Sequence, residues 1–211
     1  MSIVDRFRQH RIVPVIVIDD AKQAPSLSGA LIAGGLPIAE VTFRTAGAAD
    51  AIKRIADAHP TMVLGAGTVL TPAKVDEALA AGAKFIVAPG LSAAVVERCK
   101  ERDVPVFPGV CTPTELEAAL SHGLTTLKFF PAEPMGGVPF LKAMSAPYVG
   151  VSFIPTGGIS AANLKDYLGM KQVIACGGSW MAPAEWTAAG QFDRIRAATA
   201  DAVALANGAS R

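Results

Sequence analysis

The sequence has few charged residues and no run of like charges. Charged residues make up 18% of the 211 positions, and the formal net charge is +1. This balance gives no electrostatic support for binding nucleic acid or a membrane surface. Apolar residues make up 51%, which is typical of a compact protein with a large core.

Cysteines are also scarce. Cys99, Cys111 and Cys176 are odd in number and widely spaced, unlike a disulfide framework. No apolar run approaches the roughly 20 residues that a transmembrane helix needs. Residues 1–11 lack the apolar core of a signal peptide. We therefore expect a soluble cytoplasmic protein.

Metal-binding patterns are missing as well. His10, His59 and His122 fall at or near the ends of predicted helices, and no cluster of His, Cys, Asp or Glu shows ligand spacing. Cys111 and Cys176 have no neighbouring base, so we interpret them as packing residues. The sequence predicts neither a metal nor a cofactor.

The sequence is rich in short apolar segments. These alternate with helix-like segments that end in glycine. They are nearly uninterrupted apolar runs, as in parallel sheets covered by helices. Eight such units predict a (β/α)8 TIM barrel with an additional N-terminal helix at residues 1–10, in a single domain of residues 1–211. The alternative, an open doubly wound sheet, usually has G-x-G-x-x-G after its first strand, where this chain has IDDAK. The predicted strands are residues 12–18, 37–43, 62–64, 84–88, 104–107, 125–131, 151–155 and 172–176.

One of these strands, residues 125–131, carries a lysine in its middle. Lysine is almost never fully buried unless it is paired or functional. Burial strips water from the ammonium and favours the neutral amine, which is a nucleophile toward carbonyl groups. The alternative is that the stem of Lys128 is buried while its charged head reaches water.

The second strand places polar side chains on one face. Glu40 and Arg44 share that face, while Ala39, Val41 and Phe43 point toward the predicted helix layer. Active sites of such barrels lie at the C-terminal strand ends. A partly desolvated Glu40 is therefore a candidate general acid/base, and Arg44 a candidate donor to a substrate carboxylate. A buried structural ion network is the alternative.

Two glycine clusters follow the predicted seventh and eighth strands. Barrels often bind phosphate between the loops after these two strands. Glycines allow backbone N–H groups to approach phosphate oxygens, and a serine hydroxyl adds a donor. The alternative is that these glycines serve only as tight turns. The clusters are Gly157-Gly158, preceded by Thr156, and Gly177-Gly178-Ser179.

Six sequence blocks together resemble the 2-keto-3-deoxy-6-phosphogluconate aldolase family, the class I aldolases of the Entner–Doudoroff pathway. The resemblance covers nearly the whole chain and keeps the order of the motifs. The blocks are residues 40–45 (EVTFRT), 65–69 (GAGTV), 89–90 (PG), 128–133 (KFFPAE), 155–159 (PTGGI) and 177–180 (GGSW).

The resemblance implies reversible cleavage of a phosphorylated 2-keto-3-deoxy sugar acid to pyruvate and glyceraldehyde 3-phosphate, without a metal, in a homotrimer. It implies that Lys128 forms the Schiff base and that Glu40 transfers protons. The remaining matched residues are Arg44 and Thr68 near the pyruvate carboxylate, Pro89 and Phe130 lining the site, Thr156 at the substrate hydroxyls, and Gly157, Gly158, Gly177, Gly178 and Ser179 at the phosphate.

Other functions remain open on the sequence alone. Related reactions are cleavage of the galactonate epimer or of 4-hydroxy-2-oxoglutarate, and decarboxylation of oxaloacetate. A phosphosugar isomerase or epimerase would use Glu40 as its base and Lys128 only electrostatically. A barrel that merely binds a phosphorylated metabolite is a third class.

Overall fold

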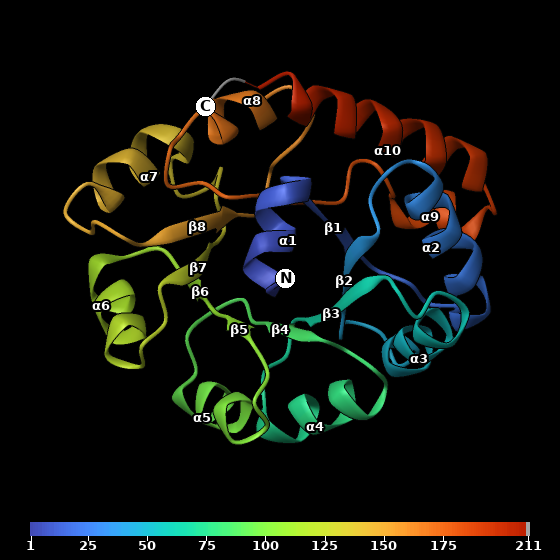
Figure 1. The fold of residues 1–211 in the computed structure, drawn as a ribbon, viewed down its shortest axis with the longest axis horizontal. Helices are drawn as coiled ribbons and strands as arrows, with labels where there is room; N and C mark the ends of the chain where they lie inside the picture. Colours follow the sequence, from blue (N-terminus) through green and yellow to red (C-terminus); the bar gives the residue numbers. More distant parts are fainter. Residues whose placement is uncertain (210–211) are drawn as a thin grey trace.

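The structure, a computed structural model, describes residues 1–209 as a ring of parallel strands surrounded by helices (Figure 1). The strands are β1 (Ile12–Ile16), β2 (Ile38–Thr42), β3 (Val63–Gly67), β4 (Phe85–Val87), β5 (Val106–Phe107), β6 (Gly109–Val110), β7 (Thr126–Phe129), β8 (Ser152–Pro155) and β9 (Cys176–Gly178). They form two sheets, with the orders β5-β4-β3-β2-β1-β9 and β6-β7-β8.

Both seams between these sheets are closed. The parallel bridges Phe153–Val173 and Thr156–Gly177 join β8 to the segment that contains β9. At the other seam β5 continues into β6 across Pro108, so these two short strands together occupy one strand position of the barrel. The prediction of a (β/α)8 barrel is thereby confirmed.

Helices cover the outside of the ring, as expected for parallel strands that are buried on both faces (Figure 1). They are the 3-10 helix η1 (Ala21–Gln23), α2 (Ala24–Ala33), α3 (Ala48–Ala58), α4 (Pro72–Ala80), α5 (Ala93–Glu101), α6 (Pro113–Ser121), α7 (Gly137–Ser145), α8 (Leu164–Leu168), α9 (Ala184–Ala188) and α10 (Phe192–Asn207), and one further helix, α1 (Ile3–His10), precedes β1. Among residues 1–209, none of these helices is both long and apolar enough to cross a bilayer.

The structure corrects two predicted strands. The strand predicted at residues 104–107 is shorter in the structure, where β5 covers only Val106–Phe107. The chain continues beyond the predicted range as β6, because Pro108 lacks an N–H and interrupts the ladder between the two strands. The strand predicted at residues 172–176 was placed too early: β9 begins at Cys176 and includes both Gly177 and Gly178, which the sequence analysis assigned to the following loop. Glycine has low strand propensity, so only the pairing with β1 identifies this strand.

The additional N-terminal helix, α1, lies across the centre of the ring (Figure 1). Ser2 and Asp5 form a capping box at its start, and α1 is followed directly by β1, so the helix covers the amino ends of the strands. Phe7 is 1% exposed, and its ring lies 5.2 Å from that of Phe85 and 4.9 Å from that of Phe107. The barrel interior is therefore filled from below and is accessible from the carboxyl ends of the strands.

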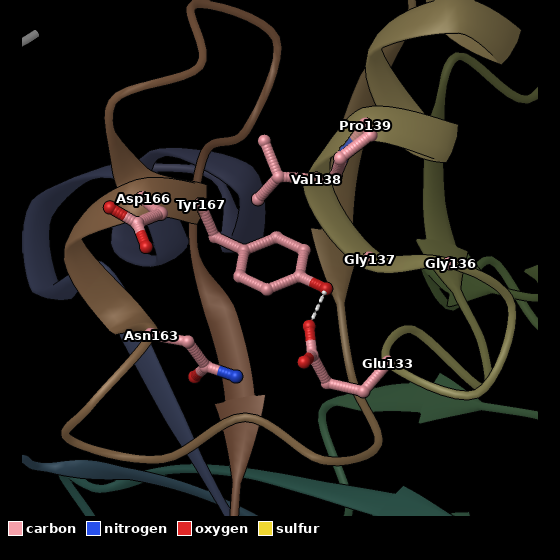
Figure 2. A pocket seen from close by; sticks show the side chains of 8 residues that line it. All are labelled: Glu133, Gly136, Gly137, Val138, Pro139, Asn163, Asp166 and Tyr167. Atoms are coloured by element: carbon pink, nitrogen blue, oxygen red, sulfur yellow. Dashed lines mark hydrogen bonds between the residues drawn. The ribbon is translucent and has the colours of Figure 1, made fainter.

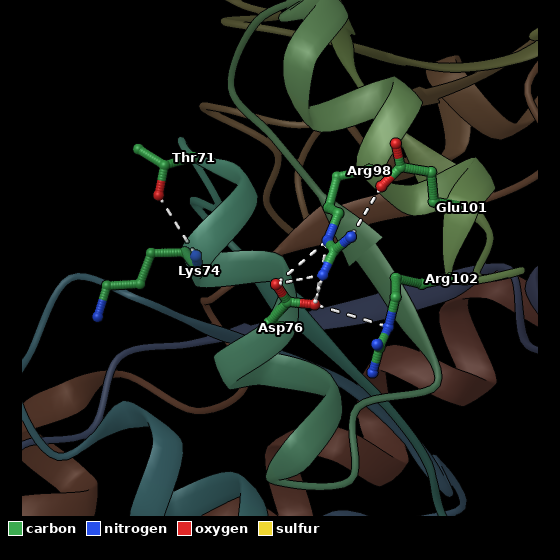
Figure 3. Close-up of polar contacts among 6 residues, drawn as sticks. All are labelled: Thr71, Lys74, Asp76, Arg98, Glu101 and Arg102. Atoms are coloured by element: carbon green, nitrogen blue, oxygen red, sulfur yellow. Dashed lines mark hydrogen bonds and ion pairs between the residues drawn. The ribbon is translucent and has the colours of Figure 1, made fainter.

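An ion network joins α4 and α5 on the outer surface (Figure 3). The guanidinium of Arg98 donates through Nε and Nη2 to both carboxylate oxygens of Asp76, at 2.8–3.2 Å. Arg98 Nη1 also donates to Glu101 at 2.7 Å, and Arg102 Nε lies 3.6 Å from Asp76. These contacts raise the pKa of Arg98, chiefly through the hydrogen bonds to Asp76.

Candidate active site

A lysine and a glutamate face each other inside the barrel. Lys128 on β7 and Glu40 on β2 have side chains that are only 6% and 5% exposed, and Lys128 Nζ lies 3.6 Å from Glu40 Oε1. The ammonium also lies 5.0 Å from the centroid of the Phe130 ring. Glu40 Oε1 is buried and accepts no hydrogen bond from the residues that the structure describes.

This pair is poorly satisfied for a buried ion pair. A 3.6 Å separation is too long for a good hydrogen bond. Buried charges offset their desolvation cost only when geometry is excellent and additional hydrogen bonds satisfy the remaining groups. The arrangement is therefore a weak source of stability, and it leaves an amine and a carboxylate available to a molecule that enters the barrel.

A glycine on the neighbouring strand makes room for the carboxylate. Gly67 is the last residue of β3 and pairs in register with Thr42 of β2. A Cβ atom at position 67 would lie 2.0 Å from Glu40 Oε1. Any larger residue at position 67 would push the carboxylate away from Lys128, which gives a physical reason for the GAG sequence in this strand.

An open cavity of about 260 Å³ lies above this pair. It brings together the two predicted glycine clusters, from the end of β8 and from β9, with Arg44 and Phe130. Thr156 and Gly177 line this cavity and also the narrow interior space beside Lys128 and Glu40. The cavity and the buried pair are therefore neighbours across these two residues. The lining residues are Val15, Arg44, Phe130, Thr156, Gly157, Gly158, Ile159, Gly177, Gly178 and Ser179.

The glycines of this cavity are needed for close packing as well as for turns. Gly157 and Gly158 have φ values of +100° and +83°, which favour glycine. In β9, a Cβ atom on Gly177 would lie 2.3 Å from Thr156 Oγ1, and one on Gly178 would lie 2.0 Å from the Trp180 ring. Because glycine has no Cβ atom, a phosphate can approach the backbone N–H groups of these residues closely and accept hydrogen bonds from them.

Arg44 and Thr68 meet at the rim. Arg44 Nε donates to Thr68 Oγ1 at 3.3 Å. Thr68 has φ 56°, a left-handed conformation that is a genuine outlier for a β-branched residue and is typical of functional positions. The contact leaves the two terminal nitrogens of the guanidinium available to a carboxylate.

Pro89 is the one predicted site residue that lies neither in this cavity, nor in the Lys128–Glu40 pair, nor against Arg44. It follows β4 and is half-buried, and its carbonyl oxygen lies close to Gly109, where a Cβ atom would be 2.0 Å away. Its place beside a substrate stays a prediction. All the others lie in the cavity, in the Lys128–Glu40 pair or, for Thr68, against Arg44.

Two apolar residues that line the cavity were not predicted from the sequence. Val15 on β1 and Ile159 after β8 border the cavity. Val15 pairs in register with Glu40, and Val13, two residues earlier, borders the interior space beside Lys128. Residues two apart in a strand point to the same face, so an inward Val13 implies an inward Val15.

Titratable groups elsewhere near the barrel give no second reactive centre. Burial raises the pKa of the Cys176 thiol, and burial with a contact to Glu115 raises that of Cys111, so both thiols stay protonated. Within residues 1–209 no group of three or more His, Cys, Asp and Glu side chains is arranged to hold a metal ion.

Comparison with known sequences identifies relatives over almost the whole chain. The sequence pattern of the family described as KDPG and KHG aldolase matches residues 3–198. The 2-dehydro-3-deoxy-phosphogluconate aldolase of Treponema pallidum (strain Nichols) is 45% identical over 93% of this chain and 94% of its own. The KHG/KDPG aldolase of Escherichia coli (strain K12) is 45% identical over 91% of this chain and 90% of its own.

Comparison with solved structures gives the same result. A KDPG aldolase from Legionella pneumophila superposes with a TM-score of 0.92, at 36% identity, over 95% of this chain and 98% of its own. That crystal structure holds pyruvate captured at low pH as a covalent carbinolamine intermediate.

Proposed function

This chain belongs to the KDPG and KHG aldolase family, and we propose that it cleaves 2-dehydro-3-deoxy-6-phosphogluconate reversibly to pyruvate and D-glyceraldehyde 3-phosphate. It is an aldehyde-lyase of class I, acting through a Schiff base. The observation that carries the proposal is the buried Lys128–Glu40 pair beside a glycine-lined cavity.

Lys128 is the proposed nucleophile. Its neutral amine attacks the C2 ketone to give a carbinolamine, which loses water to form a protonated imine. The imine then accepts the electron pair of the C3–C4 bond as that bond breaks, which gives an enamine and releases glyceraldehyde 3-phosphate. The first step needs the lysine nitrogen as a free amine, and the carboxylate of Glu40, 3.6 Å away, is the neighbouring group that can take its proton.

Glu40 is the proposed general acid/base. Its Oε1 is 3.6 Å from the lysine nitrogen and has no other partner in the described part of the chain, so it is free to accept a proton. It takes a proton from the C4 hydroxyl as the C3–C4 bond breaks and returns one to the enamine carbon. Water then hydrolyses the resulting imine, and pyruvate leaves.

The two ends of the substrate are assigned to different groups of residues. We assign the carboxylate to Arg44 and Thr68 at the rim, and the hydroxyls to Thr156. The phosphate is assigned to Gly157, Gly158, Gly177, Gly178 and Ser179, with Phe130 and Pro89 flanking the carbon chain. The charge of the phosphate is balanced there by backbone N–H groups.

Three finer points belong to the same proposal. The relative from E. coli is named for both substrates, so we expect a weaker cleavage of 4-hydroxy-2-oxoglutarate to pyruvate and glyoxylate. We propose the gluconate epimer over the galactonate epimer, and turnover of the two compared side by side tests this choice. We also propose a homotrimer in the cytoplasm, and light scattering on the purified protein tests its mass.

Trapping of the imine tests the central step. The protein is incubated with pyruvate and sodium borohydride, and its peptides are mapped by mass spectrometry. We expect a reduced pyruvate adduct on Lys128. A folded protein that forms no adduct in excess pyruvate, or forms it on another lysine, overturns the mechanism.

A further inference from the structure

A hydrogen bond between Tyr167 and Glu133 joins two loops outside the residues assigned so far. Glu133 lies in the loop between β7 and α7, and Tyr167 lies on α8, which follows the glycine loop after β8. The Tyr167 hydroxyl donates to Glu133 Oε1. Figure 2 shows the tyrosine ring reaching across a cleft of about 780 Å³ to meet the carboxylate.

The backbone around Glu133 is bonded directly to the glycine loop. Ala132 N donates to Thr156 O at 2.9 Å, and Glu133 N donates to Gly157 O at 3.0 Å. A Cβ atom on Gly158 would lie 2.6 Å from Cβ and Cγ of Glu133, so the glutamate stem packs flat against this glycine. Movement of Glu133 would therefore move Gly157 and Gly158.

Asn163 fastens the same loop from its other end. Its Nδ2 donates to Gly158 O at 3.0 Å, and its Oδ1 accepts from Ser160 N at 2.8 Å. Asn163 also borders the cleft with Glu133 and Tyr167 (Figure 2). The loop of Gly157 and Gly158 is thus held between the asparagine on one side and the glutamate on the other.

Tyr167 is suited to hold the glutamate in one position. The residue is fully buried, and burial together with the bond to Glu133 raises the pKa of its hydroxyl, which remains a donor at neutral and alkaline pH. A Cβ atom on Gly137 would lie 3.0 Å from Glu133 Oε1 and 3.4 Å from Tyr167 Oη, so the backbone of α7 supports the bonded pair from below.

We propose that Glu133 and Tyr167 are positioning residues that fix the glycine loop of the phosphate site and so determine the preference for phosphorylated substrates. The inference rests on the proposed function, because Gly157 and Gly158 are assigned there to the phosphate. The hydroxyl and the carboxylate touch no reacting atom, and they act through the loop.

Steady-state kinetics on two substrates test this role. KM and kcat are measured for 2-dehydro-3-deoxy-6-phosphogluconate and for 4-hydroxy-2-oxoglutarate, which has no phosphate. Tyr167→Phe and Glu133→Ala each remove the hydrogen bond. We expect KM for the phosphorylated substrate to rise about fivefold, the size of one lost hydrogen bond, with a smaller change in kcat. KM for 4-hydroxy-2-oxoglutarate should stay the same.

Two further variants separate positioning from charge and from general destabilisation. Glu133→Gln keeps an acceptor for Tyr167, and we expect it to restore most of the affinity for the phosphorylated substrate. Tyr148→Phe is the matched control: Tyr148 donates to Glu117 at 2.9 Å, a second tyrosine–glutamate bond away from the glycine loop. We expect no change in either KM for this control.

Equal rises in KM for both substrates, or no rise for the phosphorylated one, would overturn the proposal. Binding of inorganic phosphate, measured by ³¹P NMR titration, provides a readout that needs no catalysis. We expect Tyr167→Phe to weaken phosphate binding about fivefold relative to the parent protein and to Tyr148→Phe. If the parent forms no pyruvate adduct on Lys128, the aldolase proposal fails by itself, and the phosphate titration still decides the role of Tyr167.

Discussion

Two pairs of opposite charges in this protein differ in how fully their atoms are satisfied. On the outer surface, Asp76 accepts four hydrogen bonds from Arg98 at 2.8–3.2 Å, and Arg102 adds a longer contact (Figure 3). Inside the barrel, Lys128 and Glu40 lie 3.6 Å apart, and Glu40 Oε1 accepts no hydrogen bond in the described chain.

The difference distinguishes a contact suited to stabilise the fold from a pair suited to the proposed chemistry. In the outer pair two guanidinium nitrogens contact both carboxylate oxygens, but the side chains of Arg98 and Asp76 are 31% and 39% exposed, so water screens the pair and its contribution to stability is modest. The inner pair has lost its hydration without gaining full replacement. An unsatisfied pair within a barrel is therefore expected to matter for chemistry, and a satisfied pair between outer helices for stability.

Removal of the inner lysine should have the largest effect. We expect Lys128→Ala to lower kcat/KM by at least about 10³-fold, because Lys128 is the lysine among the described residues that line the cavity and the interior space beside it. Cleavage is followed by coupling the release of pyruvate to lactate dehydrogenase. Lys53→Ala, which removes an exposed lysine paired with Asp57, should retain full activity. If Lys128→Ala cleaved the substrate at the rate of the parent protein, Lys128 could not be the residue that forms the Schiff base.

Replacement of the inner carboxylate should have the next largest effect. Glu40→Gln keeps the shape but cannot accept a proton, so we expect kcat to fall by about 100-fold or more. Borohydride trapping on Lys128 should still occur, at a lower rate. The control is Glu117→Gln, on the outer helix α6. A kcat within twofold of the parent would show that Glu40 is only a structural partner of the lysine.

A smaller loss should follow when the carboxylate is displaced and not removed. In Gly67→Ala the new methyl group would meet Glu40 Oε1, and the flexible side chain must move away. We expect kcat to fall about 10- to 100-fold while the protein stays folded, because small misplacements of catalytic groups are costly. Gly29→Ala is the control, since its Cβ makes only ordinary contacts at 3.6 Å and beyond. Equal kcat values for the two variants would argue against this account of the GAG sequence.

The outer network should give the smallest effect, and on stability alone. We expect Asp76→Asn to lower the melting temperature by about 1–3 °C and to leave kcat unchanged. The difference should shrink in 1 M NaCl, because salt screens exposed charges. Asp57→Asn, which removes a single contact at 3.4 Å, should not lower the melting temperature. A loss of activity in Asp76→Asn would contradict the division between the two pairs.

Much of the fold followed from local patterns. Apolar runs and the glycines that end helices predict the alternation of strands and helices, and the helix predicted at residues 1–10 contains α1 (Ile3–His10). The exceptions have physical causes. Pro108 interrupts the hydrogen-bond ladder between β5 and β6, and the apolar run at residues 104–107 does not predict this interruption. The strand β9 consists of Cys176, Gly177 and Gly178, and these residues show no strand pattern in the sequence.

The candidate site was predictable at positions where a charged residue stands in an otherwise apolar stretch of sequence. A lysine in the apolar strand β7 and a glutamate in β2 are such residues, and the structure brings them together. Glu133 and Tyr167 carry no such signal, because a glutamate in a loop and a tyrosine on a helix are ordinary residues. Their contact spans 34 positions of the chain and depends on how α8 packs beside the loop after β7.

The sequence by itself determined the barrel, the lysine within an apolar strand and the glycine-rich ends of the last two strands, because periodicity and residue chemistry are local properties. Only the tertiary structure decided the 3.6 Å separation of Lys128 and Glu40, the space that Gly67 leaves for the carboxylate, and the hydrogen bond from Tyr167 to Glu133. These features arise where residues distant in the chain meet at the closed ring of strands, and their distances are set by packing that no local pattern encodes.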